Sequence, residues 1–188
     1  MKKKILSVLF IFIMCFTLIG CGKTNNNSSN KKEETKSQEK EISVEGIKIK
    51  FDKEDKYTNG FKYKYSSSFK IDSLGTTRFY RLFNSDNKRI VEIRVTTSLE
   101  SPESALAERK NNYYNDNTTD VKNEDKVFND KKWSYIEYNN TSKGNNYKNH
   151  DYYYLYNKEY CIVKFIIDSS TNDISELEKE FMNNISFE

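Results

Sequence analysis

The sequence has little histidine, cysteine, glycine and proline: one, three, six and one, respectively, in 188 residues. Catalytic triads and metal sites need several groups in a defined geometry, and His150 has no second histidine to join it. No glycine-rich phosphate loop occurs, nor does a G-x-S-x-G or H-E-x-x-H motif. The sequence therefore predicts no catalytic residue, no metal site and no cofactor.

The first 21 residues carry a targeting pattern. Three lysines, at positions 2–4, precede an apolar run over residues 5–18 that is broken only by Ser7 and Thr17. This run is shorter than the roughly 20 residues that a membrane-spanning helix needs. It ends in Leu18, Ile19, Gly20 and Cys21. This ending resembles the lipobox of bacterial lipoprotein signal peptides.

The resemblance implies cleavage before Cys21 and a diacylglycerol on its sulfur. We therefore expect a signal peptide over residues 1–20 and a lipid anchor at Cys21, which places the protein on the extracytoplasmic face of the cell membrane. An ordinary secretory signal and an uncleaved anchor are the alternatives. Much Lys, Asn, Ile, Tyr and Phe with little Ala, Gly and Pro suggests an A+T-rich genome, and hence a Gram-positive bacterium.

The charge balance argues against nucleic-acid binding. The whole chain has 31 basic and 28 acidic residues, but three of the basic residues are the lysines of the expected signal peptide. The remaining chain is neutral, whereas a nucleic-acid binder needs surplus positive charge to displace counterions. We expect no nucleic-acid partner.

The expected mature chain divides into a linker and one domain. Residues 22–41 contain no Val, Ile, Leu, Met or aromatic residue, so they cannot bury enough surface to become ordered. With Cys21 they form the linker, residues 21–41, whose flexible span is about 25 Å. Residues 42–188 form the domain, and Cys161 has no partner there, so a packed core must stabilise it.

Alternating apolar residues predict several strands in this domain. One strand is expected over 43–51, and others over 61–65, 122–127 and 133–138. Two hairpins are expected, over 80–95 with a turn at 84–87 and over 152–167 with a turn at 157–159. Residues 141–149 are expected to be a polar loop. Helices are predicted after Ser101-Pro102-Glu103 and over 173–183, with a last short strand over 185–187.

Hairpins followed by helices favour an α+β fold with a mainly antiparallel sheet and helices packed on it. Three patches, at Tyr57 to Tyr63, Arg89 to Thr97 and Phe181 to Phe187, together with this order of elements, are similar to the PsbP-like domain. The similarity covers residues 57–188. It implies an α/β/α sandwich around an antiparallel sheet. That family is functionally diverse and largely non-catalytic, so the similarity implies no site residues.

Aromatic residues cluster in and near the second hairpin. Exposed aromatic rings could stack on sugars or hold a peptide, so the candidate ligand-binding residues are Trp133, Tyr135, Tyr152, Tyr154 and Tyr156. Tyrosine is also a good strand former that suits half-buried sheet faces. We favour this second interpretation and keep ligand binding as the alternative.

Three further sets of residues carry chemistry in principle. His150 stands beside Asp151 in a polar stretch, and we interpret it as a solvated or rim histidine. Cys161 falls on an apolar strand face, as a buried small hydrophobe does. Glu176, Glu178 and Glu180 are expected to be solvated. The sequence therefore favours a non-enzymatic binding or accessory domain of the envelope. Its expected partners are the membrane, through Cys21, and an envelope protein or wall glycan. The alternatives are a wall-glycan or peptide-binding protein that uses the tyrosines, and an envelope-processing enzyme that uses His150 and Asp151.

Overall fold

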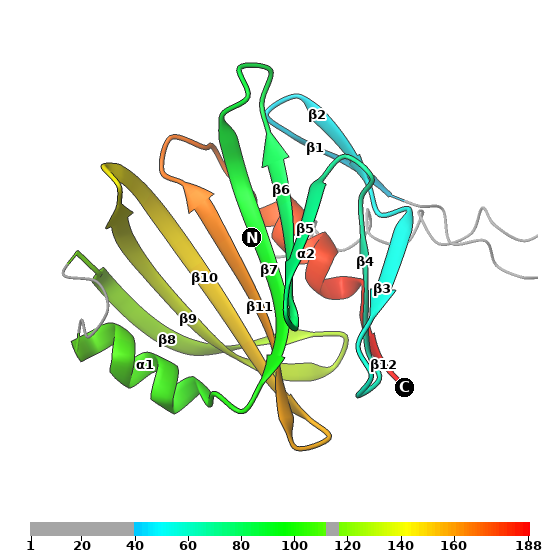
Figure 1. Ribbon diagram of the computed structural model, residues 1–188, viewed down its shortest axis with the longest axis vertical. Coiled ribbons are helices and arrows are strands. Elements are labelled where there is room, and N and C mark those ends of the chain that lie inside the picture. Colours follow the sequence, from blue (N-terminus) through cyan, green and yellow to red (C-terminus); the bar gives the residue numbers. More distant parts are fainter. Residues whose placement is uncertain (1–39, 112–116) are drawn as a thin grey trace, which may run out of the picture. The chain divides into compact units, whose positions relative to one another are not determined.

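The computed structural model describes residues 40–111 and 117–188, and the signal, the lipobox and nearly all of the linker lie outside them. Figure 1 shows how the described elements are arranged. The helices are α1 (Pro102–Asn111) and α2 (Ser175–Asn183). The strands are β1 (Glu41–Val44), β2 (Ile47–Lys50), β3 (Lys53–Lys56), β4 (Phe61–Tyr65), β5 (Lys70–Leu74), β6 (Thr77–Phe83), β7 (Arg89–Ser98), β8 (Thr119–Phe128), β9 (Lys131–Ser142), β10 (Asn145–Tyr156), β11 (Glu159–Asp168) and β12 (Ile185–Phe187).

A seven-stranded sheet with the order β5-β6-β7-β11-β10-β9-β8 dominates the fold. All of its neighbouring strands are antiparallel. The strands β5 to β7 form one meander, and β8 to β11 form another. Pairing of β7 with β11 joins the two. Two smaller sheets, β12-β4-β3 and β1-β2, complete an α+β architecture.

The main core lies on one face of the large sheet, under α2 and the smaller sheets (Figure 1). Alternate residues of β11, namely Cys161, Val163 and Phe165, are fully buried there. In α2, Leu177 and Phe181 are buried at helical spacing. Because Ile162 is buried on the opposite face of β11, this strand has packed layers on both sides, as a central strand does.

The helix α1 covers only part of the opposite face, where it packs on β8 and β9. A smaller cluster joins Ala105 of α1 to Ile136, Tyr138, Tyr153 and Ile162 of the sheet. The helix begins as predicted: the backbone N–H of Ser104 donates to Oγ of Ser101 at 3.2 Å, and Pro102 takes the first helical position, which needs no donor. Neither described helix is long and apolar enough to cross a membrane.

Two predictions of local structure are wrong. The segment 43–51 is a hairpin and not one strand, because Glu45 and Gly46 adopt positive φ angles of 49° and 78° and turn the chain. The segment 141–149 is no loop: Lys143 and Gly144 make a tight turn, and the polar residues on both sides extend β9 and β10. The strands β3 and β5 have no counterpart in the prediction, because neither has an alternating apolar pattern.

Candidate functional site

The aromatic residues of the second hairpin do not form an exposed surface. Trp133, Tyr135 and Tyr152 are at most 2% exposed and fill the main core. Tyr154 and Tyr156 are partly exposed and pack on Phe187, with ring centroids 4.9 and 4.7 Å away. The first three therefore cannot offer a ring face to a ligand in this conformation. Their placement fits strand residues that pack the core.

His150 and Asp151 lie on opposite faces of the large sheet, because neighbouring residues of a strand point in opposite directions. His150 faces the α2 side, where Nδ1 lies 3.0 Å from both carboxylate oxygens of Glu178. Asp151 is buried on the α1 side, 3.3 Å from Nζ of Lys164. A catalytic pair made from these two residues is therefore excluded by the geometry.

The prediction that Glu178 is solvated is wrong. This residue is 7% exposed, and it also accepts a hydrogen bond from the Tyr152 hydroxyl. Its position four residues after Ile174 and three before Phe181 puts it on the buried face of α2. That spacing is the signal that could have found it. The side chain of His150 is 14% exposed and borders a cavity, so it fits the rim part of the prediction and not the solvated part.

A cavity of about 160 Å³ borders this His150–Glu178 pair, between α2 and the ends of β10 and β11. Its lining includes Lys148, Asp168 and Asp173. A carboxylate on one ring nitrogen orients an imidazole, as in a general base. Here, however, the second nitrogen, Nε2, is buried and has no hydrogen-bond partner among the described residues. The arrangement anchors α2 to the sheet and gives a substrate no access to that nitrogen.

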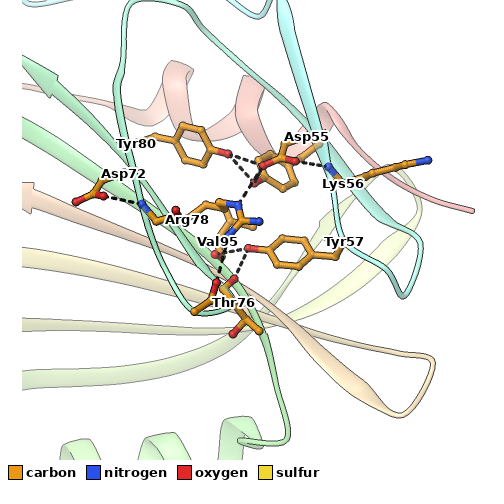
Figure 2. Close-up of polar contacts among 11 residues, drawn as sticks. Asp55, Lys56, Tyr57, Asp72, Thr76, Arg78, Tyr80 and Val95 are labelled. Atoms are coloured by element: carbon orange, nitrogen blue, oxygen red, sulfur yellow. Dashed lines mark hydrogen bonds and ion pairs between the residues drawn. The ribbon is translucent and has the colours of Figure 1, made fainter.

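A second polar cluster joins the small β12-β4-β3 sheet to β6 (Figure 2). The hydroxyls of Tyr63 and Tyr80 lie 2.6 Å apart, so one donates to the other, and Oδ2 of Asp55 lies 3.2 and 3.3 Å from the two oxygens. Nε of Arg78 lies 3.4 Å from the same oxygen. Burial raises the pKa of both tyrosines, so they stay neutral donors. This cluster satisfies its own hydrogen bonds and fixes the two sheets together.

The Cys161 thiol is buried in the main core. Burial raises its pKa to about 12, so the reactive thiolate is absent at neutral pH. The interpretation as a small buried hydrophobe is confirmed. Concerning metals, residues 40–111 and 117–188 contain no group of three or more His, Cys, Asp or Glu side chains that could hold an ion.

The part of the large sheet beside α1 carries a different set of side chains, here called the open face. It comprises Phe79, Arg81, Arg89, Glu92, Arg94 and Lys164 from β6, β7 and β11. Glu92 is 1% exposed although it points away from the main core. Nε of Arg81 lies 2.5 Å and Nε of Arg94 lies 2.6 Å from its carboxylate. The sequence carries no local signal for this site, because Arg81 meets Glu92 only through the pairing of β6 with β7.

No family model matches the chain, and no curated protein matches its sequence. Among solved structures, cyanobacterial PsbP (CyanoP) from Synechocystis sp. PCC 6803 superposes with a TM-score of 0.52 and 10% identity, over 72% of this chain and 92% of that one. The fold is PsbP-like. A crystal structure from Bacteroides thetaiotaomicron VPI-5482 has a TM-score of 0.51 and 11% identity over 72% of this chain, which spans 48% of that longer protein. At such identities the likeness concerns the fold alone.

Proposed function

We propose that the chain is a lipid-anchored, extracytoplasmic binding or accessory module of the bacterial envelope, without enzymatic activity. The lipobox Leu18–Cys21 supports the anchor, and two acyl chains suffice for stable membrane attachment. The polar segment between Cys21 and β1 supplies a tether with a span of about 25 Å, long enough to hold a domain clear of the lipid headgroups.

The open face is the observation that carries the binding role. Charged side chains on a folded surface are normally scattered, but here three arginines gather on one buried carboxylate beside the partly exposed ring of Phe79. Arginine and aromatic residues are enriched where proteins bind partners. The face therefore has the composition of a recognition surface.

The anchor is tested by labelling cells that express the chain with radioactive palmitate. We expect the wild type to carry label and to sediment with membranes. Cys21→Ser should lose the label and appear in the soluble fraction or the medium. Cys15→Ser is the matched control, because position 15 lies within the expected signal peptide and should leave labelling unchanged.

An unlabelled wild type, or a Cys21→Ser variant as firmly bound to membranes as the wild type, would refute the anchor. The non-enzymatic role has its own test on the purified protein. If the protein hydrolysed a glycan, peptide or ester from a panel of such substrates, and a single substitution at His150 or Glu178 abolished that activity, the binding role would be replaced by a catalytic one.

A further inference from the structure

Arginine is scarce in this chain, and its placement is selective. Only five of the 31 basic residues are arginines, namely Arg78, Arg81, Arg89, Arg94 and Arg109. Three of the five bind the single carboxylate of Glu92. Lysine is a flexible point charge, whereas the planar guanidinium offers five donors in a fixed fork suited to oxyanions. The chain thus concentrates its oxyanion-binding side chains at one place.

Strand pairing builds the cluster. Arg81 of β6 lies directly across from Glu92 of β7, and Arg94 is two residues along β7 on the same face. Oε2 of Glu92 accepts from Nε of Arg81 at 2.5 Å and from Nη1 of Arg89 at 3.1 Å. Oε1 accepts from Nε of Arg94 at 2.6 Å. Both oxygens of the buried carboxylate are therefore occupied.

Aromatic rings hold the three guanidinium groups in place. Those of Arg81 and Arg94 lie 5.1 and 5.5 Å from the ring centroid of Phe79, and that of Arg89 lies 5.1 Å from Tyr147. Such contacts fix the plane of a guanidinium, so that it loses little conformational freedom when a ligand binds. The donors are thus arranged before any ligand arrives.

The cluster retains a net positive charge and hydrogen-bond donors that Glu92 does not use. Three guanidinium groups share one buried carboxylate, and the only further acid within reach among the described residues is Asp72. Its side chain is 65% exposed, and its contact with Arg81 is long, at 3.6 Å. The side chains of Arg81, Arg89 and Arg94 remain 29%, 28% and 41% exposed. Arg94 contacts Glu92 through Nε, and its two terminal amino groups make no hydrogen bond to any other described residue.

We propose that Arg81, Arg89 and Arg94 form a binding site for a phosphate group, carried by a lipid headgroup or by a soluble phosphate ester. A phosphate presents three or four oxygens and can accept from three guanidinium groups that converge from different directions. A carboxylate has only two oxygens, and Glu92 already fills that role at the base of the site. This inference rests on the proposed binding role, but it does not depend on a lipid at Cys21.

The test uses the chain from residue 21 onward with Cys21→Ser, so that no lipid contributes to binding. One arm titrates inorganic phosphate and pyrophosphate by calorimetry. The other sediments the protein with phosphatidylglycerol vesicles, against phosphatidylcholine vesicles as the neutral reference. Binding to anionic vesicles alone identifies the headgroup as the source, and binding to pyrophosphate alone identifies a soluble ester. Both should weaken as salt is raised.

Arg94→Gln should weaken binding about tenfold or more, because it removes charge-assisted hydrogen bonds. Arg94→Lys keeps the charge but not the fork and should also bind more weakly. Arg78→Gln is the matched control: it removes the same charge from a side chain of similar exposure, 33%, that pairs with Asp55 on the other side of the sheet. Circular dichroism confirms that each variant is folded.

Equal binding by Arg94→Gln and Arg78→Gln would overturn the site, and so would the absence of binding to both probes. If Arg94→Lys bound as tightly as the wild type, net charge alone would explain the binding, and the proposed site would also be overturned. Loss of membrane anchoring in cells leaves these results untouched, so failure of the anchor and failure of the phosphate site can be told apart.

Discussion

Glu92 illustrates how a buried charge depends on its partners. Burial alone would raise the pKa of this carboxyl, but the hydrogen bonds from Arg81 and Arg94 outweigh it and hold the pKa below its usual value. A carboxyl with a lowered pKa in the folded state stabilises the fold above its unfolded pKa, and this contribution is lost as pH falls through the folded pKa. We therefore expect the free energy of unfolding to fall steeply in acid.

Glu92→Gln should lower the free energy of unfolding at pH 7 by about 3 kcal/mol, because three arginines lose their shared partner. It should also make the free energy of unfolding fall less steeply with pH below about pH 4, measured by urea unfolding at a series of pH values. The control is Asp72→Asn, an exposed partner of Arg81, which should change stability by less than about 0.5 kcal/mol. An unchanged acid slope in Glu92→Gln would contradict this account.

At the level of single residues, the sequence predicted Cys161 correctly and Glu178 wrongly. An apolar strand pattern specifies burial directly, so Cys161 could be assigned from its neighbours. A buried carboxylate depends on partners supplied by other elements, here His150 and Tyr152 from β10. Those contacts are set by how α2 docks on the sheet, which no local pattern contains.

At the level of elements, the turn between β3 and β4 shows how a glycine allows close approach of two segments. Gly60 has φ +90°, and a Cβ atom there would lie 2.4 Å from the carbonyl oxygen of Glu188. The backbone N–H of Glu188 donates to the Gly60 carbonyl at 3.0 Å. A side chain at position 60 would push apart the end of β12 and its partner β4.

Gly60→Ala should lower the free energy of unfolding by about 3 kcal/mol, which combines backbone strain with loss of the β12 contact. Gly144→Ala, in the turn between β9 and β10, is the matched control. It has a similar φ of +77°, but no atom lies within 4 Å of a Cβ placed there. It should cost only about 1 kcal/mol. Equal costs in denaturant melts of the two variants would show that contact with Glu188 is unimportant.

The long, apolar elements were predictable and the polar ones were not. The strand β7 alternates, β11 is an almost continuous apolar run, and α1 has a clear start at Ser101-Pro102. The ends of β9 and β10 are rich in Asn and Lys, so their sequence favours a loop. They are strands because each satisfies the backbone hydrogen bonds of the other, an effect that residue propensities do not record.

At the level of the whole molecule, the fold class followed from the order of hairpins and helices, and the structure confirms it as an antiparallel α+β fold. The open face could not be predicted in the same way. Its arginines lie at positions 81, 89 and 94, and only the pairing of β6 with β7 brings the first of them to Glu92. Of the tyrosines kept as alternative ligand-binding residues, Tyr135 and Tyr152 fill the core, as the favoured interpretation of them as strand residues predicts.

The pairing of β7 with β11, here called the seam, affects how fast this chain folds. Each meander grows from tight turns between neighbouring strands, whereas the seam joins Val91 to Ile167 and Val95 to Val163 across a long stretch of chain. Closing that stretch costs entropy before the contacts form, so the seam should belong to the rate-limiting barrier. Val95→Ala should therefore slow refolding, measured by stopped-flow fluorescence of the single tryptophan, Trp133. If the substitution changed only the unfolding rate, the pairing of β7 with β11 would form after the rate-limiting barrier.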